Sequence, residues 1–222
     1  MPMDVDLAVR QRRAFRRGAP RVEKRADGKD VIRGVSPVYY RADDPGTEFE
    51  LWPGLVERVR AGAAKKASEA GADVRSFYNH DPNQVLGRTV AGTLRLAETD
   101  AGLAYEVEPP DTQTARDLLQ SMRRGDVDGS SYMYWVRRRT WEEDLERNLD
   151  ILWLDEVEVI EVGPVAIPAY SSAGSELGKA AAGEGPEALR ASYAAWLEER
   201  ARANAGDLEG VRRRLRLLEL RA

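Results

Sequence analysis

The 222-residue sequence contains no cysteine and a single histidine, His80. The lack of cysteine excludes disulfides, a thiolate nucleophile and a zinc site with cysteine ligands. A single histidine also excludes a histidine-rich metal centre. Any reaction that needs an imidazole to move a proton near neutral pH therefore has one candidate in this chain.

Long hydrophobic runs are absent too. No segment approaches the ~20 apolar residues of a membrane span, and residues 1–7 lack the basic start and apolar stretch of a secretory signal. We therefore expect an intracellular protein without a membrane partner. The hydrophobic share of 42% and the charged share of 32% are typical of a soluble globular protein. The length suits one compact domain with extensions.

Positive charge is concentrated near the N-terminus. Residues 10–25 hold eight arginines and lysines and one glutamate, Glu23. We interpret residues 1–30 as a basic N-terminal arm, a solvated and poorly ordered tail. Binding of nucleic acid or of an acidic partner is the alternative, but nucleic acid is not expected because Phe15 is the arm's one aromatic residue for base stacking.

Alternating apolar residues and turn signals predict a strand-rich domain after the arm. The predicted strands cover residues 31–40, 49–52, 74–78, 85–98, 102–108, 130–136, 149–159 and 161–167. A first helix is predicted to open at Pro53-Gly54 and to continue toward Gly71. A second begins at Asp111 or Thr112 as N-cap and ends at Gly125. Residues 137–148 are interpreted as a charged excursion between strands.

The composition changes again after residue 170. Residues 171–186 are rich in Ala, Gly and Ser and are predicted to be a linker. Helical patterns follow over 187–205 and 208–220, so we interpret 187–222 as a helical C-terminal extension. Its apolar stripe indicates packing against a second copy, a scaffold or the domain itself.

Six short motifs occur in a recognisable order. They are Arg33-Gly34-Val35-Ser36-Pro37-Val38-Tyr39, Leu51-Trp52-Pro53-Gly54, Asn79-His80-Asp81 with Val85-Leu86-Gly87-Arg88, Gly102-Leu103-Ala104-Tyr105-Glu106-Val107, Gly125-Asp126-Val127-Asp128-Gly129-Ser130-Ser131-Tyr132-Met133-Tyr134, and Ile160 to Tyr170. Over residues 31–170 the chain resembles the tailed-phage prohead serine protease family, relatives of the herpesvirus assemblin proteases. The resemblance implies an α+β fold, mainly an antiparallel β-barrel decorated by a few helices.

The resemblance also implies three catalytic residues. His80 matches the family's catalytic histidine, and Ser131 matches its serine. Strand alternation places Ser130 on the opposite face, so only one of the two hydroxyls can face His80. Glu161 aligns with a family glutamate and is the candidate for the third member. Asp81 is the alternative, but side chains of neighbouring residues on an extended segment point apart.

The implied activity is that of a serine endopeptidase without a metal or organic cofactor. Its substrate would be the scaffolding segment of the major capsid protein or a separate scaffold, and also the protease itself. It would act in the host cytoplasm, inside the assembling procapsid. We also expect a homo-oligomer, with a dimer as the first candidate. A non-catalytic capsid assembly or scaffold protein with the same fold, or a nucleic-acid-binding protein that uses residues 1–30, are the alternative functions.

Overall fold

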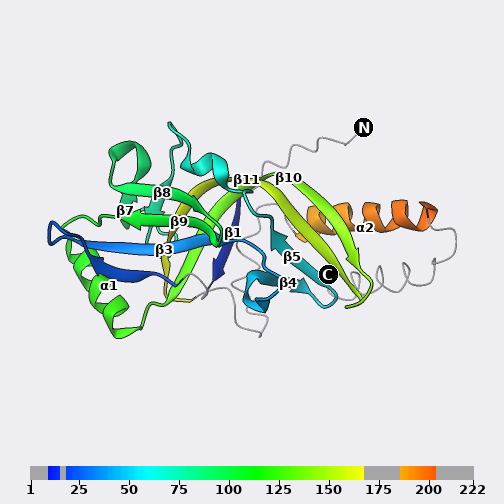
Figure 1. The fold of residues 1–222 in the computed structure, drawn as a ribbon, viewed down its shortest axis with the longest axis horizontal. Helices are drawn as coiled ribbons and strands as arrows, with labels where there is room; N and C mark the ends of the chain where they lie inside the picture. Colours follow the sequence, from blue (N-terminus) through cyan, green and yellow to red (C-terminus); the bar gives the residue numbers. More distant parts are fainter. Residues whose placement is uncertain (1–9, 16–18, 168–185, 204–222) are drawn as a thin grey trace.

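The computed structural model describes residues 10–15, 19–167 and 186–203. These residues form mostly β-sheet with a few helices (Figure 1). The strands are β1 (Arg10–Phe15), β2 (Arg21–Lys24), β3 (Asp30–Val38), β4 (Glu48–Trp52), β5 (Leu55–Val59), β6 (Arg75–Phe77), β7 (Val85–Arg88), β8 (Leu94–Thr99), β9 (Gly102–Val107), β10 (Gly129–Asp144) and β11 (Leu149–Val165). The helices are α1 (Gln113–Arg124) and α2 (Pro186–Ala203), with short 3₁₀ turns at Pro45–Thr47, Lys65–Ser68 and Thr89–Ala91.

The strands belong to two sheets. Sheet A has seven strands, in the order β1-β10-β11-β5-β4, with β6 paired to both β11 and β7. Sheet B has four strands, in the order β2-β3-β9-β8. Among the described residues no strand pairing closes either sheet, so the expected barrel is corrected to two open sheets. Strand pairs are antiparallel except where β5 and β6 run parallel to β11.

The core lies between the inner faces of the two sheets. It includes Ile32 and Leu103 from sheet B and Tyr134 and Leu154 from sheet A, all fully buried. Alternation along β10 sends Tyr132 and Tyr134 into this core together, where their rings stack at 4.5 Å. The same alternation leaves every second residue of β10 on the opposite face, which carries the site described below.

Helix α1 matches its predicted limits. The Thr112 side chain accepts a hydrogen bond from the Ala115 N–H, so Thr112 and not Asp111 is the N-cap. Gly125 ends the helix in the left-handed conformation, with φ of 82°. Ala115, Leu118, Leu119 and Met122 form its buried face.

The helix predicted to open at Pro53-Gly54 and to continue toward Gly71 is wrong. Residues 55–59 form β5, and all five of its residues are buried. A strand covered on both faces shows no apolar alternation, so its sequence resembles the start of a buried helix. The predicted excursion at 137–148 is also wrong over residues 137–144, because β10 continues to Asp144 and pairs with β11 along this length.

The basic segment is not a detached tail where the structure describes it. Residues 10–15 form β1, which pairs with β10, and residues 21–24 form β2, which pairs with β3. Pairing with a distant strand at residues 10–15 and with the next strand at residues 21–24 orders this segment despite its charge. Ion pairs assist, because Arg25 meets Glu108 at 2.8 Å and Lys24 meets Asp30 at 3.1 Å. The predicted boundary at residue 30 therefore falls inside a hairpin.

Helix α2 packs against the end of sheet A that is far from α1 (Figure 1). Tyr193, Leu197 and Ala201 form a second apolar cluster with Leu55. The Tyr193 hydroxyl also donates to the fully buried carboxylate of Asp150. The predicted linker and the predicted helix at 208–220 lie almost wholly outside the described residues. Neither α1 nor α2 is long and apolar enough to cross a membrane.

Candidate active site

His80 lies between a serine and a glutamate. Its Nε2 is 2.7 Å from Ser131 Oγ, and its Nδ1 is 2.9 Å from Glu161 Oε2. Both distances are those of hydrogen bonds. Ser131 and Glu161 are each 1% exposed, and the His80 side chain is 13% exposed. The three predicted site residues therefore meet in one chain of hydrogen bonds, in which Ser131 and Glu161 are buried and His80 is partly exposed.

Strand register explains how Ser131 and Glu161 come to share a face. Ser131 on β10 is directly opposite Gly163 on β11, and Glu161 lies two residues before Gly163. Side chains two positions apart on a strand point to the same side. Ser131 and Glu161 are thus diagonal neighbours on one face of sheet A, with space between them for one further side chain.

The segment after β6 carries His80 across this face. Strand β6 pairs in parallel with β11 at Ser76 and Val162, and the chain then crosses over Gly163. A Cβ atom at position 163 would overlap the carbonyl oxygen of Phe77, so only glycine fits there. Next, the Asn79 N–H donates to the Pro164 carbonyl at 3.1 Å. Backbone contacts to β11 therefore fix the approach of His80.

The backbone at His80 has an uncommon conformation. Asn79 and His80 both have positive φ, 53° and 60°, a region that non-glycine residues seldom occupy. The Asn79 side chain holds it in place, because its Oδ1 accepts a hydrogen bond from the Ala166 N–H at 2.8 Å. The two consecutive left-handed residues turn the imidazole back over Ser131 and Glu161.

Ser130, the neighbour of the candidate nucleophile, has a different partner. Its Oγ is 2.9 Å from the Tyr105 hydroxyl in the core. Burial raises the pKa of Tyr105, so its phenol stays protonated. The ring fits because residue 34 is glycine: a Cβ there would lie 2.5 Å from the phenol oxygen. Ser130 therefore has a structural contact to sheet B and no contact with His80.

Asp81, the alternative third member, does not contact the imidazole. Its carboxylate accepts hydrogen bonds from the Asn83 N–H at 2.8 Å and from the side chains of Asn83 and Gln84. The bond from the Asn83 N–H is the main cause that lowers the pKa of Asp81. Asp81 thus stabilises the turn after His80, and Glu161 occupies the position beside Nδ1.

A comparison with known protein families matches most of this chain. The model of the family described as Caudovirus prohead serine protease matches residues 22–184. The chain belongs to this family. It is therefore a serine protease of the kind that acts in capsid maturation.

Comparisons with solved structures and with curated proteins add less information about this chain. The solved structure of the bacteriophage T4 capsid assembly protease, gp21, is similar to this protease with a TM-score of 0.43 and 11% sequence identity. The match covers 72% of this chain and 99% of that chain. A search of curated proteins gives no match.

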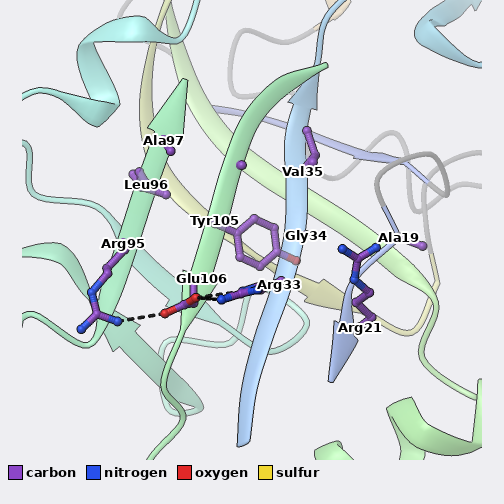
Figure 2. A pocket seen from close by; sticks show the side chains of 11 residues that line it. Ala19, Arg21, Arg33, Gly34, Val35, Arg95, Leu96, Ala97, Tyr105 and Glu106 are labelled. Carbon is purple, nitrogen blue, oxygen red and sulfur yellow. Dashed lines mark hydrogen bonds and ion pairs between the residues drawn. The ribbon is translucent and has the colours of Figure 1, made fainter. Parts of the chain in front are cut away.

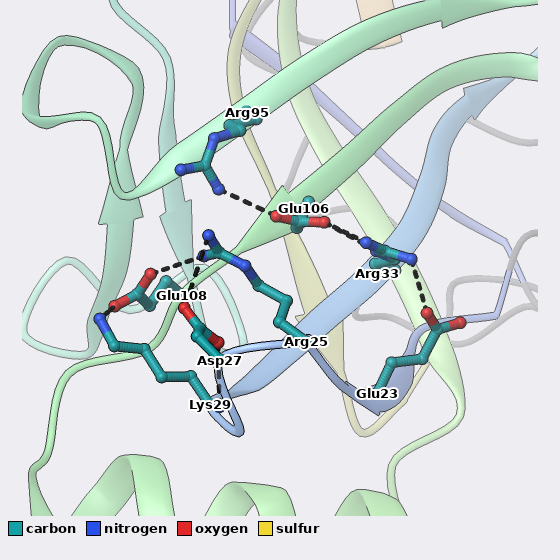
Figure 3. Close-up of polar contacts among 8 residues, drawn as sticks. All are labelled: Glu23, Arg25, Asp27, Lys29, Arg33, Arg95, Glu106 and Glu108. Carbon is teal, nitrogen blue, oxygen red and sulfur yellow. Dashed lines mark hydrogen bonds and ion pairs between the residues drawn. The ribbon is translucent and has the colours of Figure 1, made fainter.

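A groove of about 370 Å³ lies on sheet B, and His80, Ser131 and Glu161 are not among the residues that line it (Figure 2). Its lining includes small residues such as Ala97 and Ala104 and a cross-strand row of charges. In that row Glu106 bridges Arg33 and Arg95 (Figure 3). Burial raises the pKa of Glu106, but the two arginines more than offset this and lower it. The charges of the row thus largely neutralise one another.

Sequence reasoning missed three residues that shape the site of this protease. Asn79 and Gly163 position the His80 segment, and Tyr105 holds Ser130. Asn before the histidine was a usable signal, because Asn tolerates the left-handed conformation better than most residues. The other two depend on contacts across strands and have no local signature. Among the described residues, no group of three or more His, Cys, Asp or Glu side chains is arranged to hold a metal ion.

Proposed function

We propose that Ser131, His80 and Glu161 are the catalytic triad of this protease, and that its substrate is the scaffolding segment of the major capsid protein or a separate scaffold protein. The contact of Ser131 Oγ with His80 Nε2 at 2.7 Å carries the proposal. A nucleophile hydrogen-bonded to a base that a third group orients is the recurring arrangement of acyl-transfer enzymes. Cleavage takes place in the host cell, inside the assembling procapsid.

The proton moves along the observed contacts. His80 starts neutral, with its proton on Nδ1 donated to Glu161 and with Nε2 accepting from Ser131. As Oγ bonds to the peptide carbonyl carbon, its proton passes to Nε2. The peptide C–N bond then breaks, and the leaving amine takes that proton. Water gives a proton to the same nitrogen as its oxygen attacks the acyl-enzyme. The ester bond to Oγ then breaks, Oγ takes that proton back from Nε2, and the second product leaves with Ser131 restored.

Glu161 orients and stabilises the imidazole in this scheme. Its Oε2 lies 2.9 Å from Nδ1, so it selects the tautomer whose Nε2 can accept a proton. When His80 becomes positively charged, the buried carboxylate lies next to that charge. In a site from which water is excluded such an interaction is stronger than in solution.

Co-expression with the capsid protein gene from the same source tests the proposal. The wild-type chain should shorten the capsid protein or its scaffold, as measured by intact-mass spectrometry, and Ser131→Ala should leave both at full length. Ser130→Ala is the matched control, because it removes the neighbouring hydroxyl from the same strand and should still cleave. Cleavage by Ser131→Ala, or its loss in a folded Ser130→Ala variant, would refute the assignment.

The same spectra test self-processing. If the protease cleaves itself, the wild-type chain should appear as a shortened species that is missing from Ser131→Ala. A single intact wild-type mass under conditions in which the capsid protein is cleaved would exclude self-cleavage while leaving the activity on the capsid in place.

A further inference from the structure

We propose that the edge of β10 beside Ser131 is the peptide-binding edge of the protease, and that β1 occupies it as a competing strand in cis. The inference rests on the proposed function of Ser131. The ligand of this edge is an extended peptide that pairs with β10, and β1 must leave before it can bind.

The strand register carries the inference. Strand β1 runs antiparallel to β10 from Arg10, opposite Trp135, to Phe15, opposite Ser130. Ala14 is directly opposite Ser131. On its other side β10 is paired with β11 along almost its full length. The strand that carries the nucleophile therefore has both edges filled, one of them by the basic N-terminal segment (Figure 1).

Strand spacing shows that β1, while paired with β10, keeps a substrate peptide away from Ser131. Neighbouring strands lie about 4.8 Å apart, so a peptide added outside β1 would lie about 10 Å from β10. Attack requires the reacting atoms to approach to about 3–3.5 Å. A peptide paired to the outer edge of β1 is thus too far away, whereas one in the place of β1 has its backbone next to Ser131.

Two further observations agree with a closed edge. Ser131 is 1% exposed although its hydroxyl contacts His80, so a substrate carbonyl cannot reach it without displacement of the surrounding chain. The family match begins at residue 22, so β1 lies outside the matched domain. Removal of β1 from the edge would leave the strands of that domain in place, together with the segment that carries His80.

A reversible lock tests the inference in the full-length chain. Because the sequence has no cysteine, the double variant Arg10→Cys/Trp135→Cys introduces a single thiol pair, at positions directly opposite in register. Opposed residues in antiparallel strands have the Cα separation that a disulfide needs. The other end of β1 continues within a few residues into β2, which pairs with β3. The disulfide at position 10 and the pairing of β2 with β3 together restrain β1 at its two ends.

The oxidised variant should cleave with kcat/KM about tenfold or more below that of its own reduced form, because the lock removes the binding-competent population. Reduction should restore cleavage. The single variants Arg10→Cys and Trp135→Cys serve as controls, and the reductant should not change their activity. Equal kcat/KM in the oxidised and reduced double variant, with the disulfide verified by thiol titration, would overturn the inference and favour a substrate that approaches over the face of the sheet.

A fluorophosphonate that labels activated serines separates the two proposals. If the double variant is labelled at Ser131 and cleaves substrate equally in its oxidised and reduced forms, only the role of β1 fails. If neither the wild type nor the reduced variant is labelled or cleaves, the assignment of Ser131 itself fails. Thermal unfolding completes the design, because a locked and folded chain should melt no lower than its reduced form.

Discussion

Ser130 and Ser131 are adjacent on one strand and almost equally buried, at 0% and 1% exposure, yet their surroundings differ completely. Ser131 contacts an imidazole, which can accept its proton. Ser130 contacts the Tyr105 phenol, whose pKa burial raises and which therefore stays neutral. The comparison shows that exposure does not distinguish a nucleophile from a structural hydroxyl here, whereas the partner does.

The two faces of β10 separate these roles. On the Ser130 face the strand packs against sheet B and forms the core, so polar groups there must bond to one another. On the Ser131 face the segment from Phe77 to His80 crosses Gly163 of the neighbouring strand β11 and brings the imidazole to Ser131. Because side chains alternate along a strand, one face of β10 serves the core and the other serves the chemistry. We call the Ser130 face the structural side and the Ser131 face the chemical side.

A pair of alanine variants gives the most direct test of the difference between Ser130 and Ser131. We expect Ser131→Ala to lower kcat/KM on a capsid-derived peptide by about 10³-fold or more, the scale of losing a triad nucleophile. Ser130→Ala should stay within about threefold of wild type, because that hydroxyl makes no contact with the imidazole. Steady-state cleavage assays measure both. Similar losses in two folded variants would mean that the two faces are not functionally distinct.

Glu161→Gln should have the next largest effect. The amide keeps the volume of the buried side chain but removes the charge next to Nδ1, and it can hold the imidazole in the wrong tautomer. We expect kcat to fall by roughly 10²–10⁴-fold with a smaller change in KM. Full activity of Glu161→Gln would remove Glu161 from the triad. Circular dichroism of the variant checks that the buried amide leaves the fold intact.

Local patterns predicted much of this site. Alternation is a property of neighbouring residues, so the opposite orientation of Ser130 and Ser131 followed from the sequence. The cap and end of α1 were equally local, at Thr112 and Gly125. No local pattern could predict the contact between His80 and Glu161, because the two residues are 81 positions apart in the sequence. Its expectation came from family resemblance.

The failures have a common physical origin in long-range pairing. Strand β5 was predicted to be a helix because burial on both faces erased its alternation. Strand β1 was predicted to be a tail because its composition is basic, and only pairing with β10, more than a hundred residues away, makes it a strand. The two open sheets differ from the expected barrel for the same reason, since sheet closure depends on contacts that no local pattern records.

Gly163→Ala tests whether the close crossing of Phe77 over Gly163 positions His80. The added Cβ would overlap the Phe77 carbonyl oxygen, so the segment that carries His80 must shift. We expect a loss of about 1–3 kcal/mol in unfolding free energy, the usual cost of overpacking. Activity should fall by about tenfold, because small displacements of a catalytic base are costly. Urea unfolding and cleavage assays measure the two effects, and unchanged activity would show that this crossing does not position His80.

A double-mutant cycle tests the hydrogen bond between Ser130 and Tyr105 on the structural side of β10. Ser130→Ala leaves the buried Tyr105 hydroxyl without this partner, and Tyr105→Phe does the same to Ser130. Each single change should cost about 1–3 kcal/mol of unfolding free energy, and the double variant should cost less than the sum. Cleavage should stay near wild type in all three. Strict additivity would show that the two hydroxyls are not coupled.

Asp81→Asn should have the smallest effect. It tests whether Asp81, which follows His80 in the sequence, takes part in catalysis together with Glu161, the hydrogen-bond partner of His80. The asparagine still accepts a bond from the Asn83 N–H but loses the charge. Because the folded pKa of Asp81 lies below its unfolded value, its stabilisation is present above that unfolded pKa and is lost as pH falls toward the folded one. The melting temperature of wild type should therefore exceed that of Asp81→Asn slightly at pH 7, and the difference should shrink at acid pH. Cleavage at pH 7 should be near normal in Asp81→Asn, and a loss as large as that of Glu161→Gln would instead make Asp81 part of the catalytic arrangement.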